Sequence, residues 1–163
     1  MPARPSPPPR DAVPAGSDAF HRALDDLLRG APDAPACVLV TAPDEAARQE
    51  AVAAVARRTG LHLHQHDLAP LVDDDPMHTQ GNLREVFDNT MDGPALLFFD
   101  HADALFAAVE RQAREDHLDA DARTPLDYFY DRAAAIHGIV LLGLSDPAHV
   151  ARARTYGPAL VVV

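Results

Sequence analysis

Two groups of residues in this sequence have the types and spacing to support chemistry. In the first, an apolar run at 95–99 ends abruptly in Asp100, and His101 follows before a helical pattern begins. This order places a carboxylate at the carboxyl end of a buried strand, next to a histidine that could act as a general base. In the second group, His62, His64 and His66 alternate along an expected strand, so they share one face of it.

The alternating histidines are a weak candidate for a metal site. Neutral imidazoles on one face could bind zinc or nickel. Three ligands in line on one strand make a poor tetrahedron, however, and no cysteine lies near them in the sequence. The alternative is that His62, His64 and His66 form the polar face of an edge strand, and we expect no bound metal.

The elements that must position these residues alternate between strands and helices. Strands are expected at 37–40, 61–66, 95–99, 139–144 and 159–163, and helices at 46–58, 80–90, 102–115, 126–136 and 147–154. This alternation predicts an α/β fold with a parallel sheet and helices on both faces. The continuous apolar character of the strands agrees with a sheet that is covered on both faces.

Composition divides the chain of 163 residues into three parts. Residues 1–16 are rich in proline and are expected to be a disordered tail. Residues 17–35 predict a helix and a linker: Ser17 can cap the helix, and the apolar positions Phe20, Leu24, Leu27 and Leu28 have helical spacing. Residues 36–163 form the expected α/β core, which the apolar fraction of 47% supports.

Charge and cysteine content narrow the classes of function. The net charge is −11, so we expect neither nucleic acid nor an anionic membrane surface as a partner, because both require clustered basic residues. Cys37 is the single cysteine and reads as a small core residue. No apolar run is long enough to cross a bilayer and the amino terminus does not read as a signal peptide, so a cytoplasmic location is expected.

The stretch at 95–106 resembles the Walker B region of AAA+ ATPases, in which apolar residues precede Asp-Glu-Ala-Asp-Ala-Leu-Phe. The resemblance implies that Asp100 stands at the magnesium-binding position and that His101 replaces the catalytic glutamate. Ser145 falls at the sensor position. The resemblance also implies a five-stranded sheet of order 5-1-4-3-2, in a core that lacks the helical lid domain.

The Walker A region of this family falls on residues 41–49, and there the pattern is degenerate. The glycines are missing, although they let backbone N–H groups curl around phosphates. Pro43 is retained, whereas Arg48 replaces the lysine and Gln49 the magnesium-binding threonine. Asp44 introduces a carboxylate at the helix start, where it would cap the helix and repel a triphosphate.

Three hypotheses for function follow from this resemblance. The first is a non-catalytic AAA+-like scaffold or regulatory subunit that needs no cofactor. The second is a weak or unconventional ATPase that uses ATP, magnesium, Arg48, Asp100 and His101. The third is a passive ring subunit that donates Arg152 or Arg154 as an arginine finger to a neighbour.

The expected partner is a protein, either an intact AAA+ subunit or a second copy of the chain. The apolar strand at 159–163 is, by the resemblance, an edge strand, and an uncovered edge promotes association. The alternative is that the amino-terminal helix folds back over this edge. Asp100 is expected to have a structural role, either pairing with His101 or capping the following helix.

Overall fold

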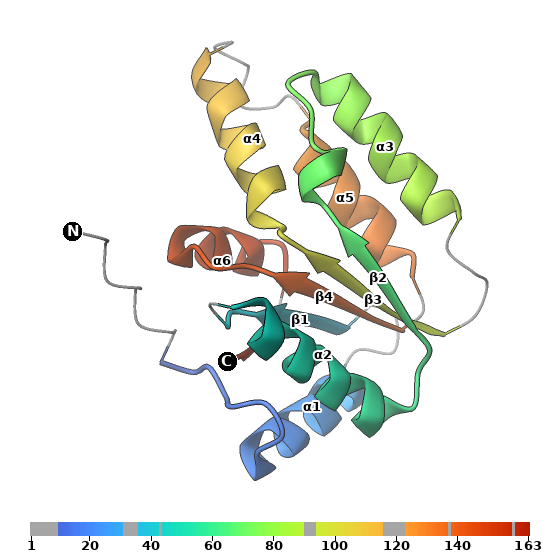
Figure 1. Cartoon of the computed structure of the whole chain (residues 1–163), viewed down its shortest axis with the longest axis vertical. Coiled ribbons are helices and arrows are strands. Elements are labelled where there is room, and N and C mark those ends of the chain that lie inside the picture. The colour runs from blue at the N-terminus through green and yellow to red at the C-terminus, as the bar shows by residue number, and fades with distance from the viewer. Residues whose placement is uncertain are drawn as a thin grey trace.

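The computed structural model describes residues 10–30, 36–42, 44–89, 94–115, 123–136, 138–157 and 159–163. Five strands form one parallel sheet in the order β2-β3-β4-β1-β5 (Figure 1). The predicted fold class and strand order are confirmed. The strands are β1 (Ala36–Val40), β2 (Leu63–Asp67), β3 (Ala95–Asp100), β4 (Gly138–Gly143) and β5 (Leu160–Val162).

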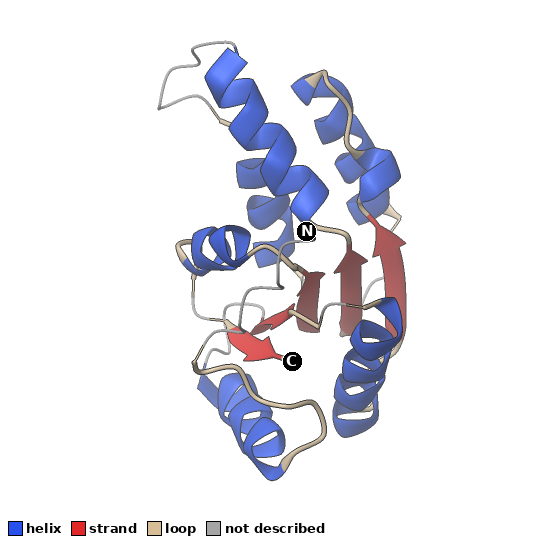
Figure 2. Ribbon diagram, turned by 60° about the vertical axis from the view of Figure 1, so that its left-hand side comes forward, coloured by secondary structure: helices blue, strands red, loops and turns tan. Residues whose placement is uncertain are grey.

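Helices cover both faces of the sheet (Figure 2). They are α1 (Asp18–Gly30), α2 (Glu45–Thr59), α3 (Pro76–Asp88), α4 (Asp103–Glu115), α5 (Pro125–Ala134) and α6 (Pro147–Arg154), with a short 3-10 helix, η1 (Ala69–Leu71), after β2. Successive side chains of β3 point to opposite faces, so Phe98 joins the core beneath α1 and α2, whereas Phe99 joins the core beneath α3 to α6. The sheet therefore separates two hydrophobic cores.

Short polar side chains set the starts of four helices. Asp44, Asp75 and Asp146 precede α2, α3 and α6, and each carboxylate accepts a hydrogen bond from a backbone N–H of the first turn. Thr124 begins α5 through reciprocal hydrogen bonds with Asp127. These caps satisfy N–H groups that have no partner inside the helix. The expected capping of α2 by Asp44 is confirmed, with 2.7 Å between its carboxylate and Ala47 N.

The segment before α1 lies along the outer edge of β5. Val13 forms a parallel bridge with Val162; its N–H donates to Val161 O at 2.9 Å, and Val163 N donates to Val13 O at 2.9 Å. The prediction that the tail extends to residue 16 is therefore wrong for residues 10–16, while residues 1–9 lie outside the described part of the chain. Composition did not predict this contact, because a segment with few apolar residues can still pair with an edge strand.

The amino-terminal helix packs beside β5, as the alternative interpretation of this edge proposed. Phe20 and Leu24 are fully buried in the same core as Val162. Leu28, in contrast, is 43% exposed, so the expected apolar face of the helix is narrower than its sequence spacing suggested. The expectation that β5 is an uncovered edge is wrong, because residues 10–16 and α1 cover it.

Candidate functional site

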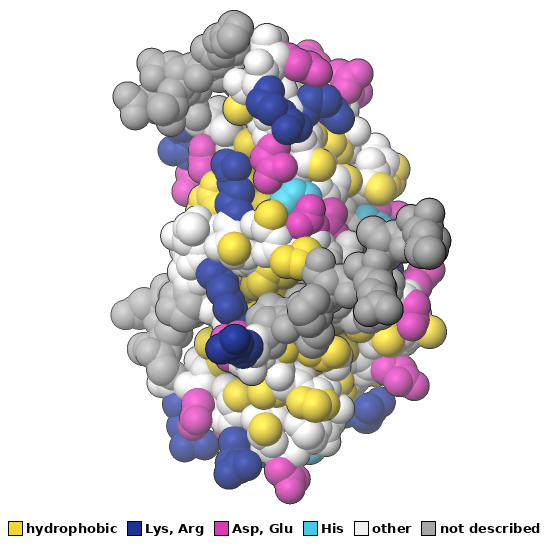
Figure 3. Space-filling model, turned by 90° about the vertical axis from the view of Figure 1, so that its left-hand side faces the viewer, with side chains coloured by type: hydrophobic (Ala, Val, Ile, Leu, Met, Phe, Trp, Pro, Cys, Tyr) yellow, Lys and Arg dark blue, Asp and Glu magenta, His cyan; other side chains and the backbone are white. Residues whose placement is uncertain are grey.

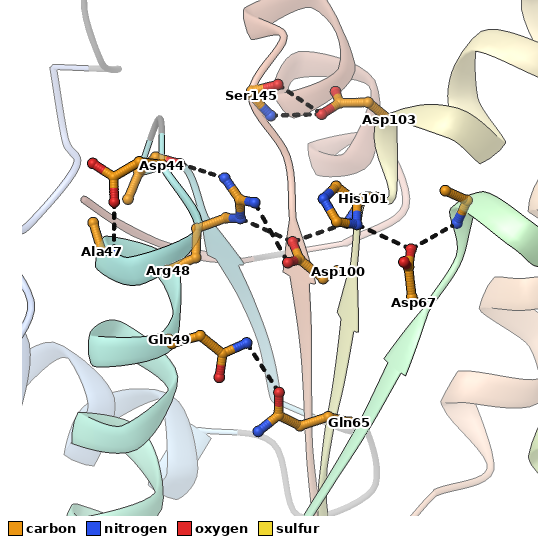
Figure 4. A network of polar contacts seen from close by, with 12 residues as sticks. Asp44, Ala47, Arg48, Gln49, Gln65, Asp67, Asp100, His101, Asp103 and Ser145 are labelled. Atoms are coloured by element: carbon orange, nitrogen blue, oxygen red, sulfur yellow. Dashed lines mark hydrogen bonds and ion pairs between the residues drawn. The ribbon is translucent and has the colours of Figure 1, made fainter.

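The start of α2 and the carboxyl ends of β3 and β4 meet at one edge of the sheet, where an ion pair occupies the centre of the site (Figure 4). Arg48 Nε donates to Asp100 Oδ1 at 2.9 Å, and Arg48 Nη2 donates to Asp100 Oδ2 at 3.4 Å. Arg48 Nη1 also donates to Ala42 O at 3.3 Å. Both charged residues are more than nine-tenths buried. The two charges thus neutralise each other inside the protein.

Asp100 is paired, but its partner is neither the His101 side chain nor the helix start that we expected. Its Oδ1 accepts from the backbone N–H of His101 at 2.9 Å, whereas the His101 side chain turns away to Asp67. The charge partner is Arg48. The resemblance placed this residue at the lysine position of Walker A and did not indicate that it binds Asp100. An arginine fits here because its planar fork can meet both carboxylate oxygens.

Gly143, the last residue of β4, leaves the space that the Asp100 carboxylate fills. A Cβ atom at this position would lie 2.3 Å from Asp100 Oδ1 and 3.4 Å from Asp100 Cα. Real contacts are never this short, so any side chain here must displace the carboxylate. The glycine is therefore part of the site although it carries no functional group.

We expect Gly143→Ala to lower the free energy of unfolding by about 1–3 kcal/mol, because the added methyl group pushes Asp100 off Arg48. Urea denaturation measures the change. In an Asp100→Ala background the same substitution should cost less than about 0.5 kcal/mol, since the clashing oxygen is gone and the two positions couple. Equal costs in the two backgrounds would contradict this explanation.

His101 adopts a left-handed backbone conformation with φ of 54° and leads the chain from β3 into α4. Its Nδ1 lies 2.9 Å from Asp67 Oδ1, which also accepts from Ala69 N at 3.0 Å. Burial raises the pKa of Asp67, but the hydrogen bonds from Ala69 and His101 outweigh burial and lower it. A carboxylate that orients an imidazole in this way is a feature of histidine general bases.

Ser145, which the resemblance placed at the sensor position, contacts Asp103 rather than the ion pair. Its backbone N and Oγ donate to Asp103 Oδ2 at 2.8 and 2.9 Å, and Asp146 N donates to Oδ1 at 3.2 Å. The Asp103 carboxylate therefore ties the start of α4 to the turn after β4. Arg48, Asp100, His101, Asp103 and Ser145 line a small hollow of about 30 Å³ with Gly143 and Leu144.

His149 lies on α6 and completes the Asp103 network. Its role was not predicted from the sequence. His149 Nδ1 lies 2.7 Å from Asp103 Oδ1, its Nε2 lies 3.4 Å from Glu110 Oε2, and its ring stacks on Phe106. Serine, histidine and aspartate also form hydrolase triads, but here the Ser145 hydroxyl donates to Asp103 and not to the histidine. The network joins α4 to α6 and is not arranged as a nucleophilic site.

His149 makes the stability of the protein depend on pH. Burial lowers its pKa, but the hydrogen bond that the ring donates to Asp103 and the charges of Asp103, Asp146 and Glu110 together raise it above the usual value of 6.5. A histidine with a raised pKa stabilises the folded state fully below its unfolded pKa, and this contribution is lost as the pH rises through the folded pKa.

We therefore expect His149→Gln to destabilise the protein more below about pH 6 than at an alkaline pH above the folded-state pKa of His149, where the wild-type imidazole is neutral. Denaturant titrations of both proteins at a series of pH values measure this difference. His62→Gln, at an exposed position outside the Asp103 network, serves as the control for the loss of a histidine. A cost for His149→Gln that rises with pH would refute the assignment.

His64 and His66 lie in the outer strand β2 and share one face of it, as predicted, whereas His62 directly precedes the strand, which begins at Leu63 rather than at residue 61. The His62 and His64 rings meet edge to face with 4.8 Å between centroids, and the His66 ring stacks on Phe99 at 5.5 Å. Burial, with the nearby His64, lowers the pKa of His66. In the described part of the chain, no group of three or more His, Cys, Asp or Glu side chains is placed to hold a metal ion.

Gln49, which the resemblance placed at the magnesium-binding threonine, is not among the residues that line the hollow. Gln49 turns towards β2, where its Nε2 donates to Gln65 Oε1 at 3.0 Å (Figure 4). Pro43 lies outside the described residues. Of the residues that the sequence placed in this region, Arg48 is the one that the fold brings to Asp100.

Comparison with known proteins gives a partial match. The human protein named ATPase family gene 2 protein homolog B is 34% identical over 97 residues, which cover 57% of this chain and 13% of that protein. No family model matches the chain. The match supports an ATPase-like relationship. It agrees with the resemblance that residues 95–106 carry and with the parallel α/β sheet.

The two arginine-finger candidates lie on α6, away from the residues that line the hollow. Arg154 Nη2 donates to Asp11 Oδ2 at 2.5 Å, and this hydrogen bond is the main reason that the pKa of Asp11 is lowered. Arg152 lies beside Tyr156, whose pKa it lowers against the stronger effects of burial and Asp127. Arg154 therefore holds the amino-terminal segment in place.

Among the described helices, none combines the length with the apolar content that crossing a bilayer would require.

Proposed function

We propose that this chain is an AAA+-like domain without ATPase activity that works through contacts with other proteins. The observation that carries the proposal is the buried ion pair between Arg48 and Asp100. By the resemblance, these two positions are those of the phosphate-binding lysine and the magnesium-binding aspartate. In this chain they bind each other instead.

The ion pair opposes nucleotide binding energetically. A phosphate that recruited Arg48 would leave Asp100 buried without its partner, and a magnesium ion on Asp100 would do the same to Arg48. Leaving one member of a buried pair uncompensated costs about 3–5 kcal/mol. A nucleotide would have to recover this cost before any net binding appeared.

Two further features of the site act in the same direction. The Asp44 carboxylate already accepts from Ala47 N at the start of α2, where a phosphate would otherwise bind. The hollow, with a volume of about 30 Å³, is also far smaller than the range of about 300–1,000 Å³ that small-molecule pockets occupy. Both features support a domain that has no nucleotide cofactor.

Isothermal titration calorimetry with Mg-ATP tests the proposal. We expect no saturable heat at millimolar nucleotide, and none for Arg48→Lys, because restoring the lysine does not restore the missing glycines. Thermal unfolding provides a second measurement: ATP at 100 times its dissociation constant would stabilise the fold by about 2.7 kcal/mol. A saturable heat or a stabilisation of this size would refute the proposal.

The pairing of His101 with Asp67 favours a second candidate, the unconventional ATPase. Because Asp67 orients the ring, His101 could act as a base towards a water molecule in the hollow. For this candidate to hold, the wild type must release phosphate from ATP. The variant His101→Gln must abolish that release and leave the unfolding midpoint unchanged. Undetectable release from the wild type leaves the non-catalytic proposal in place.

Protein partners fit the charge of the chain better than nucleic acid or membrane does. On the face that Figure 3 shows, basic side chains stand among acidic ones rather than in a patch. Together with the net charge of −11, this favours a protein surface. The arginine-finger alternative would require Arg154 to leave Asp11, which makes this role less favourable than scaffolding.

A further inference from the structure

The two edges of the sheet differ in how they are covered. At β5, Val13 hydrogen-bonds to the strand and closes the edge. At the opposite edge, β2 is the last strand, and among the described residues no strand pairs with its outer side. Figure 2 shows this strand at the margin of the sheet, with no helix lying beyond it.

The backbone of β2 shows which residues face outward. His62 O accepts from Leu96 N on β3, and Leu68 N donates to Asp100 O. In a parallel ladder alternate residues direct both their N–H and C=O groups to the same neighbour. The even-numbered residues of β2 therefore bond to β3, and Leu63, Gln65 and Asp67 present their peptide groups to the outside.

This outward row is self-complementary. The strand Leu63–Asp67 is centred on Gln65, so a second copy aligned antiparallel places Leu63 opposite Asp67 and Gln65 opposite itself. The outward peptide groups of the two copies then face one another as hydrogen-bonded pairs. The even-numbered residues between them become the closely spaced pairs, with Cα atoms about 4.5 Å apart.

In this alignment His64 of each copy stands opposite His66 of the other, and all four imidazoles lie on one face. Along one strand the two histidines are separated by about 6.6 Å, and across the pair by less. Zinc prefers four nitrogen or sulfur ligands in a tetrahedron. One strand offers its ligands in line, whereas two strands offer them from opposite sides.

We propose that two copies of this chain pair through the outer edges of β2 and bind one zinc ion through His64 and His66 of each copy. The stacking of His66 on Phe99 holds that ring on the shared face before binding. A cation is needed because each copy has a net charge of −11, and two such copies repel. No residue of the hollow takes part, so this proposal goes beyond the proposed function and fails or succeeds separately from it.

Sedimentation velocity of the purified chain, with zinc and with EDTA, tests the proposal. We expect monomers in EDTA and dimers when half an equivalent of zinc is added, with one zinc ion per two chains by elemental analysis. His64→Gln and His66→Gln should each abolish dimer formation. His62→Gln and His78→Gln, which change histidines that are not proposed zinc ligands, should leave the dimer intact.

A separate variant tests the strand edge itself. Gln65→Pro removes an outward N–H and places a ring on the edge, so it should block the dimer while the ladder to β3 persists. Circular dichroism checks that each variant is folded. The proposal is overturned if the dimer forms in EDTA, if it survives His64→Gln, if Gln65→Pro remains dimeric, or if zinc binds the monomer alone or not at all.

Discussion

Replacing Gly138 by alanine is expected to lower the free energy of unfolding by about 4 kcal/mol or more, enough to unfold a marginally stable domain. Gly138 begins β4 with φ of +143°, a conformation that L-residues rarely adopt. A Cβ atom there would lie 1.9 Å from the backbone oxygen of Ala95. Since Ala95 and Gly138 are paired in the ladder between β3 and β4, the clash can be relieved only by separating two central strands.

Gly81→Ala is the matched control for Gly138→Ala. Gly81 lies within α3, and a Cβ atom there would meet nothing within 4 Å. Alanine should therefore stabilise the helix by up to about 1 kcal/mol. Urea titrations of the three proteins compare the effects. A Gly138→Ala protein that unfolds at the wild-type denaturant concentration would contradict the close approach of β3 and β4.

Breaking the buried ion pair should have the second-largest effect. We expect Asp100→Ala to cost about 3–5 kcal/mol, because it leaves the Arg48 guanidinium buried opposite no charge. This exceeds the cost of about 1 kcal/mol for losing a helix cap, the role that the sequence suggested for Asp100. Chemical denaturation monitored by circular dichroism measures the loss.

Two controls separate the ion pair from simple side-chain loss. The double variant Arg48→Met with Asp100→Leu removes both charges and should recover most of the stability lost in Asp100→Ala. Asp25→Ala breaks the exposed pair with Arg58 and should have little effect, since solvent screens those charges. If the double variant were less stable than Asp100→Ala, the uncompensated charge would not be the cause of the loss.

The order of strands and helices could be predicted from the sequence because it depends on local patterns. The apolar run before Asp100 and its counterpart in β4 define buried strands, whatever lies elsewhere in the chain. The start of α2 at Asp44 follows from a carboxylate within reach of its own first turn. Such features depend on residues a few positions apart, so the sequence determines them directly.

The site was only partly predictable, because its contacts join distant positions. Arg48 and Asp100 are 52 residues apart, and the sequence indicated each position without showing that they bind each other. His149 gave no signal at all, since a single histidine on a short helix acquires its partners only when α6 packs on α4.

Tertiary structure alone decided which edges and spaces of the sheet are filled. Val13 reaches β5 from a segment whose composition predicts disorder, and Gly143 leaves space that only the Asp100 carboxylate explains. The sequence by itself determined the strands and the helices, and it lacks glycines at residues 41–49. The packing of those strands side by side brings Arg48 and Asp100 into an ion pair, because opposite charges in a buried place are most stable when they neutralise each other.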